Sequence, residues 1–234
     1  MKKLTLLILF LSSFAYSQQN WFKIYSDKNT LEKDGVEIGN KFISDAKILL
    51  PNLKNEPRII VNTTPYGIYY DGNEKTVNLP LWDELTPINK KFFEKITGNK
   101  KEGKKLFGFM FNGFYLSHEL GHWLTYHITG NVGSYQDEYM ANTIAMLWWK
   151  KQGKTKELKS IYKILKKIMK TYPNPVPKGE SVEKYFTENY MKILNDEENF
   201  AMIYGFMQFS QFIQIYEDKS LPSFDDFLIK NIKK

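Results

Sequence analysis

The segment His118-Glu119-Leu120-Gly121-His122, within a long apolar stretch, decides how this chain is interpreted. On a helix, residues four apart differ by only about 40° around the axis, so both imidazoles leave the same face and can bind one metal ion. Glu119 lies on the flank of that face. From there its carboxylate can take the proton of a water molecule at the metal. A pair of unrelated helix histidines is the plain alternative, and a third ligand nearby would disfavour it.

Two acidic residues, Asp137 and Glu138, compete for the role of third ligand. Asp137 stands three residues after Ser134, so a capping box at the start of a helix already accounts for it. Glu138 shares a helical stripe with small residues such as Ala141, which allow close packing against the histidine helix. Catalytic zinc usually has three protein ligands. We therefore expect Zn2+ to be bound by His118, His122 and Glu138.

Two further polar residues lie close to these motifs. Asn142, one turn after Glu138, is a candidate hydrogen-bond partner that holds a ligand imidazole in one tautomer. An ordinary buried Asn bonded to backbone is an equally open interpretation. His127 lies nine positions after His118, about 180° away on an ideal helix, so we expect it to face away from the metal.

The first 17 residues have the pattern of a secretory signal peptide. Lys2 and Lys3 precede an apolar stretch at residues 4–14, and small residues follow at 15–17, as at a cleavage site. A membrane anchor is the alternative, but the stretch is shorter than the roughly 20 residues that a spanning helix needs. We expect an exported protein, periplasmic or extracellular, that begins near Gln18 and has no stable membrane insertion after cleavage.

Composition narrows the class of protein further. The 234 residues, 42% of them hydrophobic, predict a single domain over residues 18–234. There is no Cys, which excludes thiolate metal sites, a Cys nucleophile and a cleaved lipoprotein. The net charge is +7, yet Arg58 is the only Arg, and nucleic-acid readout usually depends on Arg forks. We therefore expect no nucleic-acid partner and solvated lysine faces.

Apolar periodicity predicts a mostly helical α+β fold. A helix over residues 29–50 precedes three short β-rich runs, at 58–62, 67–70 and 76–79, which predict a small antiparallel sheet. Pro80 directly follows the third run and favours an edge strand there. Residues 98–105, rich in Gly and charge, predict a loop. Further helices are expected at about 87–96, 106–129, 134–151, 156–171, 181–194, 197–216 and from 223. The C-terminal half, about 154–234, is thus a helical extension, and its aromatic stripe favours a packed core over a substrate groove.

The motifs His118-Glu-Leu-Gly-His122 and Glu138-Tyr-Met-Ala-Asn142 resemble the gluzincin group of zinc metallopeptidases. The second is especially similar to that of ImmA/IrrE-type minimal peptidases, and the resemblance covers about residues 107–149. It implies a zincin-like fold, zinc bound by two His and one Glu, Glu119 as the base, and a peptide bound along the edge strand, which would be 76–79.

Gluzincins also use a downstream His or Tyr to stabilise the oxyanion. This chain has no His after His127, so that role would pass to Tyr185, Tyr190 or Tyr204, and the sequence does not choose among them.

These features predict an exported zinc-dependent metallohydrolase, a peptidase that cleaves a peptide or protein substrate with zinc-bound water activated by Glu119. One alternative is a non-catalytic binding or scaffold protein of the cell envelope with a structural zinc site. A closed fourth coordination position would favour it. Another is hydrolysis of a non-peptide amide such as a cell-wall crosslink.

Overall fold

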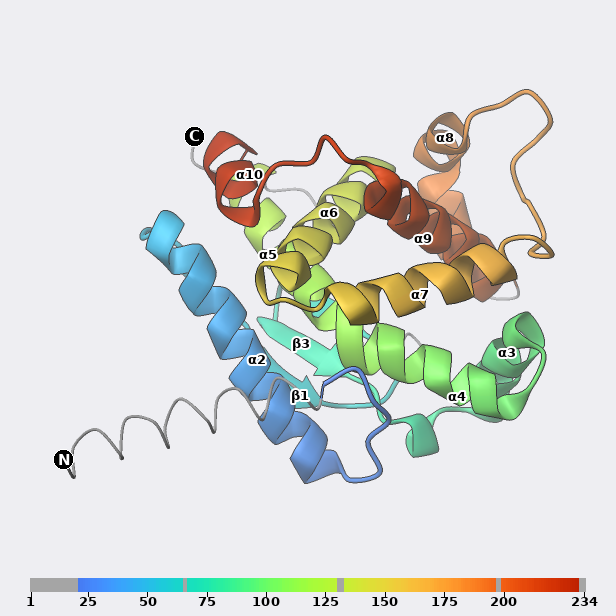
Figure 1. Ribbon diagram of the computed structural model, residues 1–234, viewed down its shortest axis with the longest axis horizontal. Coiled ribbons are helices and arrows are strands. Elements are labelled where there is room, and N and C mark those ends of the chain that lie inside the picture. Colours follow the sequence, from blue (N-terminus) through green and yellow to red (C-terminus); the bar gives the residue numbers. More distant parts are fainter. Residues whose placement is uncertain (1–20, 65–66, 130–132, 197–198, 232–234) are drawn as a thin grey trace.

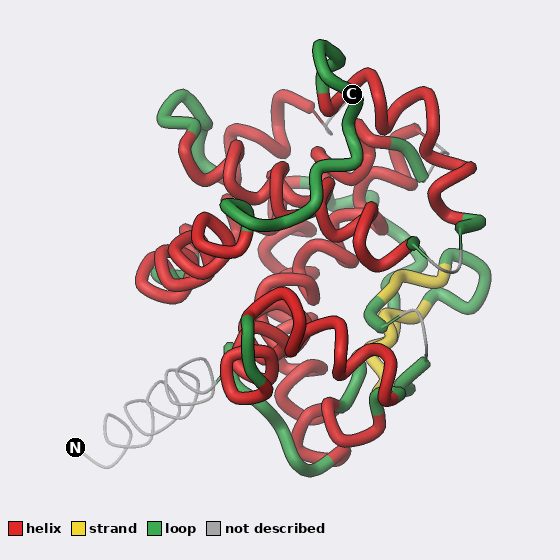
Figure 2. Tube along the Cα trace, turned by 90° about the vertical axis from the view of Figure 1, so that its right-hand side faces the viewer, coloured by secondary structure: helices red, strands yellow, loops and turns green. Residues whose placement is uncertain are grey.

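The computed structural model describes residues 21–64, 67–129, 133–196 and 199–231, without the side chains of 127–129. The chain is mostly helical (Figure 1), and its one small sheet lies at one side of the molecule in the view of Figure 2. The predicted signal peptide, residues 1–17, lies outside the described residues. Among the described residues, none of the helices has the length and apolar character needed to span a membrane.

The described α-helices agree with most of the predicted ones to within a few residues. They are α2 (Lys28–Leu49), α3 (Pro87–Thr97), α4 (Lys100–Phe109), α5 (Tyr115–Thr129), α6 (Tyr135–Lys151), α7 (Thr155–Ile168), α8 (Val182–Leu194), α9 (Phe200–Glu217) and α10 (Phe224–Asn231).

The predicted loop at residues 98–105 is wrong. Gly98 ends α3 with a left-handed backbone, φ 89°, and Asn99 caps the next helix by accepting the backbone N–H of Glu102. A C-capping glycine followed at once by an N-capping Asn permits a helix to begin at Lys100. High charge on α4 therefore marks an exposed helix surface and not a loop.

The predicted single helix over 106–129 is interrupted by a π-helical turn, Met110–Phe114. Asn112 has non-helical dihedral angles there, φ −104° and ψ 28°. The backbone of Phe22 donates to the Asn112 carbonyl (3.2 Å), and the Trp21 indole donates to the Gly113 carbonyl (2.9 Å). A π-turn adds a residue to the helix and rotates the next helical segment about the axis. The side of α5 that carries the histidines is therefore displaced relative to the apolar face of α4.

The sheet is mixed, so the prediction of an antiparallel sheet is wrong. Strand β3 (Thr76–Leu79) lies between β1 (Arg58–Val61), which is parallel to it, and β2 (Tyr69–Asp71), which is antiparallel. All four residues of β3 are buried, as expected of a central strand. Pro80 follows the last paired residue, so its missing N–H removes no ladder bond. The edge strand beside α5 is therefore β2.

Helix α2 covers one side of the sheet because two of its glycines allow close approach (Figure 1). A Cβ at Gly35 would lie 2.6 Å from Leu79, and one at Gly39 would lie 2.8 Å from Ile59. On its other side α2 contacts α6 through buried Asp45, which accepts the Trp148 indole N–H at 2.9 Å. The central pair α5 and α6 is thereby held between α2 and the C-terminal helices.

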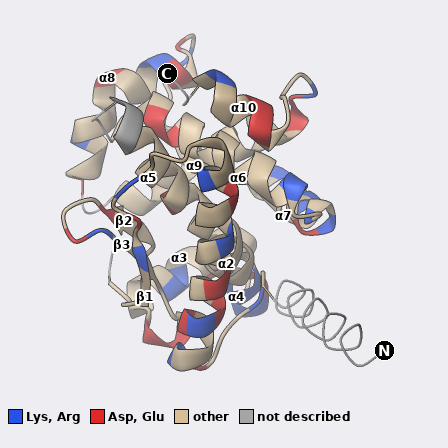
Figure 3. Cartoon of the chain, turned by 90° about the vertical axis from the view of Figure 1, so that its left-hand side faces the viewer, with Lys and Arg blue, Asp and Glu red and all other residues tan. Residues whose placement is uncertain are grey.

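The C-terminal half packs as a helical core, as expected. Phe206, Phe209 and Phe212 of α9 are buried, whereas Tyr204 lines a cleft at the candidate site. The lysines of α7 lie on its solvent side, where Figure 3 shows a band of basic residues. Leu158, Ile161, Leu165 and Ile168 of the same helix are buried.

Candidate metal centre

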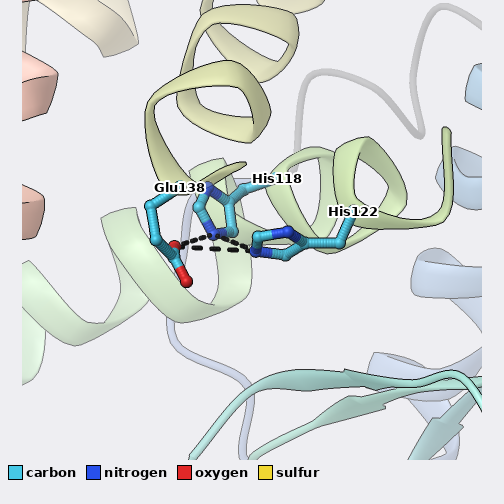
Figure 4. Close-up of side chains that lie close together, drawn as sticks. All are labelled: His118, His122 and Glu138. Carbon is cyan, nitrogen blue, oxygen red and sulfur yellow. Dashed lines mark hydrogen bonds and ion pairs between the residues drawn. The ribbon is translucent and has the colours of Figure 1, made fainter. Parts of the chain in front are cut away.

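Three buried side chains from α5 and α6 converge on one point (Figure 4). The Nε2 atoms of His118 and His122 are 3.1 Å apart. Glu138 Oε2 lies 3.2 Å from His118 Nε2 and 3.6 Å from His122 Nε2. The structure therefore brings together the three residues that the sequence singled out as ligands.

These separations suit a small metal ion. Ligand atoms about 2.0 to 2.1 Å from a tetrahedral ion stand about 3.3 to 3.4 Å from one another. The three distances between ligand atoms in the structure lie on both sides of that value. His118, His122 and Glu138 can therefore hold a metal ion.

The outer nitrogens of both imidazoles face oxygen acceptors. His118 Nδ1 lies 2.9 Å from Asn142 Oδ1. His122 Nδ1 lies 2.9 Å from Asp137 Oδ2, an ion-pair contact and not a well-aligned hydrogen bond. If each imidazole carries its proton at Nδ1, each Nε2 keeps a lone pair that faces Glu138 Oε2. That carboxylate oxygen is also an acceptor. Three acceptors facing one another at these distances favour a bound cation.

Asp137 has a role that the sequence analysis did not assign. The Ser134 side chain caps α6 as predicted, by accepting the backbone N–H of Asp137. The Asp137 carboxylate, however, turns to His122 and accepts the hydroxyl of Thr125 (2.7 Å) and the N–H of Gly133 (3.1 Å). The only signal for this in the sequence was an acid directly beside the expected ligand Glu138.

The close approach of α5 and α6 depends on a glycine within the histidine motif. A Cβ at Gly121 would lie 3.0 Å from the Ala141 Cα and 3.2 Å from its carbonyl oxygen. The small residue predicted at position 141 therefore does lie at the helix contact. Because backbone atoms block the added Cβ, a larger side chain at 121 must separate the two helices.

We expect Gly121→Val to destabilise the fold by about 1 to 3 kcal/mol and to weaken metal binding. Separating α5 from α6 moves Glu138 away from both histidines. Denaturant unfolding and competition with a zinc chelator measure the two effects. The control is Lys159→Val, which introduces the same side chain on the exposed side of α7. A second glycine such as Gly153 would not serve, because its φ of 74° would strain any Val placed there. Wild-type metal affinity in Gly121→Val would contradict the packing argument.

Burial and charge act in opposite directions on the acids and imidazoles of this centre. Burial by itself would raise the pKa of Glu138, but the charge of His122 and the close contacts with both imidazoles hold it well below its usual value. Burial would lower the pKa of His122, but Glu138 and then Asp137 raise it well above its usual value. Without a metal, the fold therefore favours a protonated His122 beside an ionised Glu138.

This preference predicts that metal affinity depends on pH. A metal ion bound at His122 must displace the proton there, and the raised pKa extends that competition to higher pH than for a free imidazole. We expect zinc affinity to fall by about tenfold per pH unit below the pKa of His122. Chelator competition across about pH 6 to 8.5 measures it. An affinity that is constant over this range would contradict the proposed protonation of His122.

Glu119 lies beside the three ligands without joining them. Its Oε2 accepts the backbone N–H of Tyr70, on edge strand β2, at 2.9 Å. Burial raises the pKa of the Glu119 carboxyl above its usual value, against the lowering effect of the charges on His118 and His122. The N–H of Tyr70 thus holds the carboxylate in place, and burial makes it a stronger base than a solvent-exposed carboxylate.

A cleft of about 480 Å³ reaches the centre from the surface. Glu119, His122 and Glu138 line its floor, and the walls come from β2, α5, α6, α8 and α9. Its aromatic lining residues are Tyr69, Tyr70, Tyr126, Tyr190 and Tyr204, and none of the described residues that line it is Lys or Arg.

Two of the three tyrosines considered for oxyanion stabilisation lie in this cleft. The Tyr190 hydroxyl donates to Glu138 Oε1 at 2.9 Å, and the Tyr204 hydroxyl is also hydrogen-bonded to Glu138. Burial, and then the negative charge of Glu138, raises the pKa of both hydroxyls. Tyr185 does not line the cleft and instead packs edge to face against Phe186.

The remaining predicted residues have different outcomes. Asn142 is buried with its amide oxygen at His118, as expected of a partner that holds a ligand imidazole, and not on the backbone. The side chain of His127 lies outside the described residues. Two buried glutamines of α9, Gln208 and Gln211, bond to Asn142 and were not singled out by the sequence analysis. They lie 66 and 69 residues further along the chain, so no local spacing indicated them.

Comparison of the chain with protein-family models, with curated proteins and with solved structures finds no match.

Proposed function

We propose that the protein is an exported zinc-dependent metallohydrolase with a zincin-like core, and specifically a peptidase of the gluzincin type. The observation that carries this proposal is the position of Glu119. Glu119 is a buried carboxylate that lines the cleft. It lies beside the three atoms of His118, His122 and Glu138 that could bind the metal, but it does not belong to that group. Two imidazoles and one carboxylate form a ligand set typical of catalytic zinc.

A bound zinc ion supplies Lewis acidity and lowers the pKa of a water molecule. The chain's own residues then determine how protons move. Glu119 accepts the proton of the attacking water and later transfers it to the leaving amine. The N–H of Tyr70 holds one Glu119 oxygen, which leaves the other free for this transfer. Asp137 and Asn142 hold the two imidazoles at their outer nitrogens.

The proposed substrate is an extended peptide that binds beside β2. The expectation that 76–79 forms the edge strand is replaced by β2, because β3 is central. Residues of β2 line the cleft next to Glu119, so a peptide added at this edge would pass the proton-accepting carboxylate. Tyr190 and Tyr204 are the candidates for stabilising the oxyanion, because both hydroxyls lie at the centre.

The structural-zinc alternative requires a closed metal site. Among the described side chains, no fourth His, Asp or Glu joins the group formed by His118, His122 and Glu138. The cleft also reaches two of the three ligands. Both observations support a site with a position left for water or substrate.

The proposal is tested with the zinc-loaded protein, residues 18–234, and a diverse library of peptides and cell-wall fragments, with products identified by mass spectrometry. Peptide cleavage that zinc removal abolishes is the expected result. Cleavage of amide-crosslinked cell-wall fragments alone would replace the peptidase proposal with the non-peptide one. No cleavage of either class by zinc-loaded protein would reject hydrolysis. The matched inactive variant is Glu119→Gln.

A further inference from the structure

We propose that helix α9 determines which nitrogen of His118 is free to bind metal, through a chain of side-chain amides formed by Asn142, Gln208 and Gln211. We call these three residues the amide relay. They are all buried. The inference rests on the metal centre and not on peptidase activity, so it can be tested separately from the proposed function.

One end of the relay is the backbone carbonyl of Tyr135, which can only accept a hydrogen bond. Gln211 donates from Nε2 to the backbone carbonyl of Tyr135 at 3.1 Å. Its Oε1 must then be the atom that faces Asn142, which donates from Nδ2 at 2.8 Å. Asn142 therefore presents Oδ1 to His118. Because amide oxygen only accepts, His118 Nδ1 must carry the proton, and Nε2 keeps its lone pair.

A second and independent path gives the same result. Gln208 donates from Nε2 to Glu138 Oε2 at 2.7 Å, and an ionised carboxylate can only accept. Gln208 Oε1 then accepts the same Asn142 amide at 2.9 Å. Both Asn142 amide protons are thereby used, and its orientation is determined from two directions. Oxygen and nitrogen of an amide are assigned from such networks, and here both fixed acceptors require one assignment.

The opposite orientation of Asn142 is unfavourable. A reversed amide would place Oδ1 against the oxygens of Gln208 and Gln211, with no donor among the three atoms. Reversing the glutamines as well would place an oxygen of Gln208 against Glu138 and one of Gln211 against the Tyr135 carbonyl. Each such mismatch leaves buried polar groups unpaired, at a cost of about 1 to 3 kcal/mol each. The relay therefore disfavours the tautomer that carries its proton at Nε2, in which the nitrogen that faces Glu138 and His122 has no lone pair for a metal.

Gln208 has a second effect on the centre. The Gln208 amide contacts the metal centre in two ways. Its Oε1 accepts from Asn142, which holds His118, and its Nε2 donates directly to the ligand Glu138. We therefore expect loss of Gln208 to weaken metal binding more than loss of Gln211. A substitution that only loosened the packing of α9 would have no reason to change the tautomer of His118.

The test compares Gln208→Met, Gln211→Met and the double variant with Gln214→Met, an exposed position on the same helix. Methionine keeps the side-chain length and removes the amide. Histidine tautomers in metal-free protein are read by ¹H–¹⁵N NMR, and with only three histidines in the chain their signals can be assigned by single substitutions. Zinc affinity is measured by chelator competition.

We expect zinc affinity to fall by about tenfold in Gln208→Met, by a smaller factor in Gln211→Met, and by up to about 100-fold in the double variant. His118 should shift from one tautomer, protonated at Nδ1, to a mixture. The inference is overturned if both single variants bind zinc within about twofold of Gln214→Met and His118 keeps the Nδ1 tautomer. The single variants decide the question even if the double variant does not fold. Because none of these readouts requires a substrate, absence of peptidase activity would leave this result intact.

Discussion

Replacing Glu138 by Ala is expected to remove most of the zinc from the purified protein. The substitution deletes one of three ligand atoms and leaves the donors Tyr190, Tyr204 and Gln208 facing an empty space. Loss of a residue that hydrogen-bonds to a metal ligand typically lowers metal affinity by about 10- to 100-fold. Loss of the ligand Glu138 itself should lower it by more. Metal content by mass spectrometry on residues 18–234 measures it, with about one zinc per chain expected in the unchanged protein.

Glu188→Ala is the matched control for this experiment. It removes the same charge from an exposed site on α8, where Glu188 pairs with Lys184 at 3.4 Å. Thermal unfolding with and without zinc separates loss of the metal from loss of the fold. If Glu138→Ala retained one zinc per chain at unchanged affinity, Glu138 would not be a ligand. If carefully prepared unchanged protein took up no stoichiometric metal, the metal centre itself would be rejected.

Replacing Glu119 by Gln is expected to lower turnover by about 10²- to 10⁴-fold without loss of zinc. The amide has almost the same shape as the carboxylate, and its oxygen can still accept the N–H of Tyr70. It cannot, however, accept the proton of the attacking water. The measurement is the rate of cleavage of a peptide found in the library, beside the metal content of the same preparation.

The two substitutions have different signatures, and their comparison is more informative than either alone. Glu138→Ala should lose metal and activity together, whereas Glu119→Gln should lose activity alone. Glu188→Gln controls for the change of charge. Wild-type turnover by zinc-loaded Glu119→Gln would show that another group accepts the proton, and Glu119 would then not be the base.

The local parts of this site could be predicted from the sequence because helix geometry determines them. His118 and His122 share a helix face at any i and i+4 spacing, and Glu138 lies on the next helix behind a recognisable Ser134 cap. Small residues at the contact between the helices indicated that the two faces can meet. The catalytic roles of these residues are predictions that the Glu138→Ala and Glu119→Gln variants test.

The sheet shows where local pattern is insufficient. Three short β-rich runs were recognisable, but strand order and direction depend on which strands pair, and that is decided by contacts outside each run. A proline directly after a β-rich run favours an edge strand, but Pro80 lies one residue beyond the ladder of β3 and is therefore compatible with a central strand. The strand proposed to bind substrate is therefore the edge strand β2, and not the strand at 76–79.

The sequence by itself determined most of the helical segments, the two ligand-bearing motifs and the candidate base, because each depends on residues within about one or two helical turns of one another. Only the tertiary structure decided what surrounds them. Tyr190, Tyr204, Gln208 and Gln211 reach the centre from α8 and α9, and Tyr70 reaches Glu119 from β2. Such contacts join residues roughly 50 to 70 positions apart, so they exist only after the chain has folded and leave no periodic trace in the sequence.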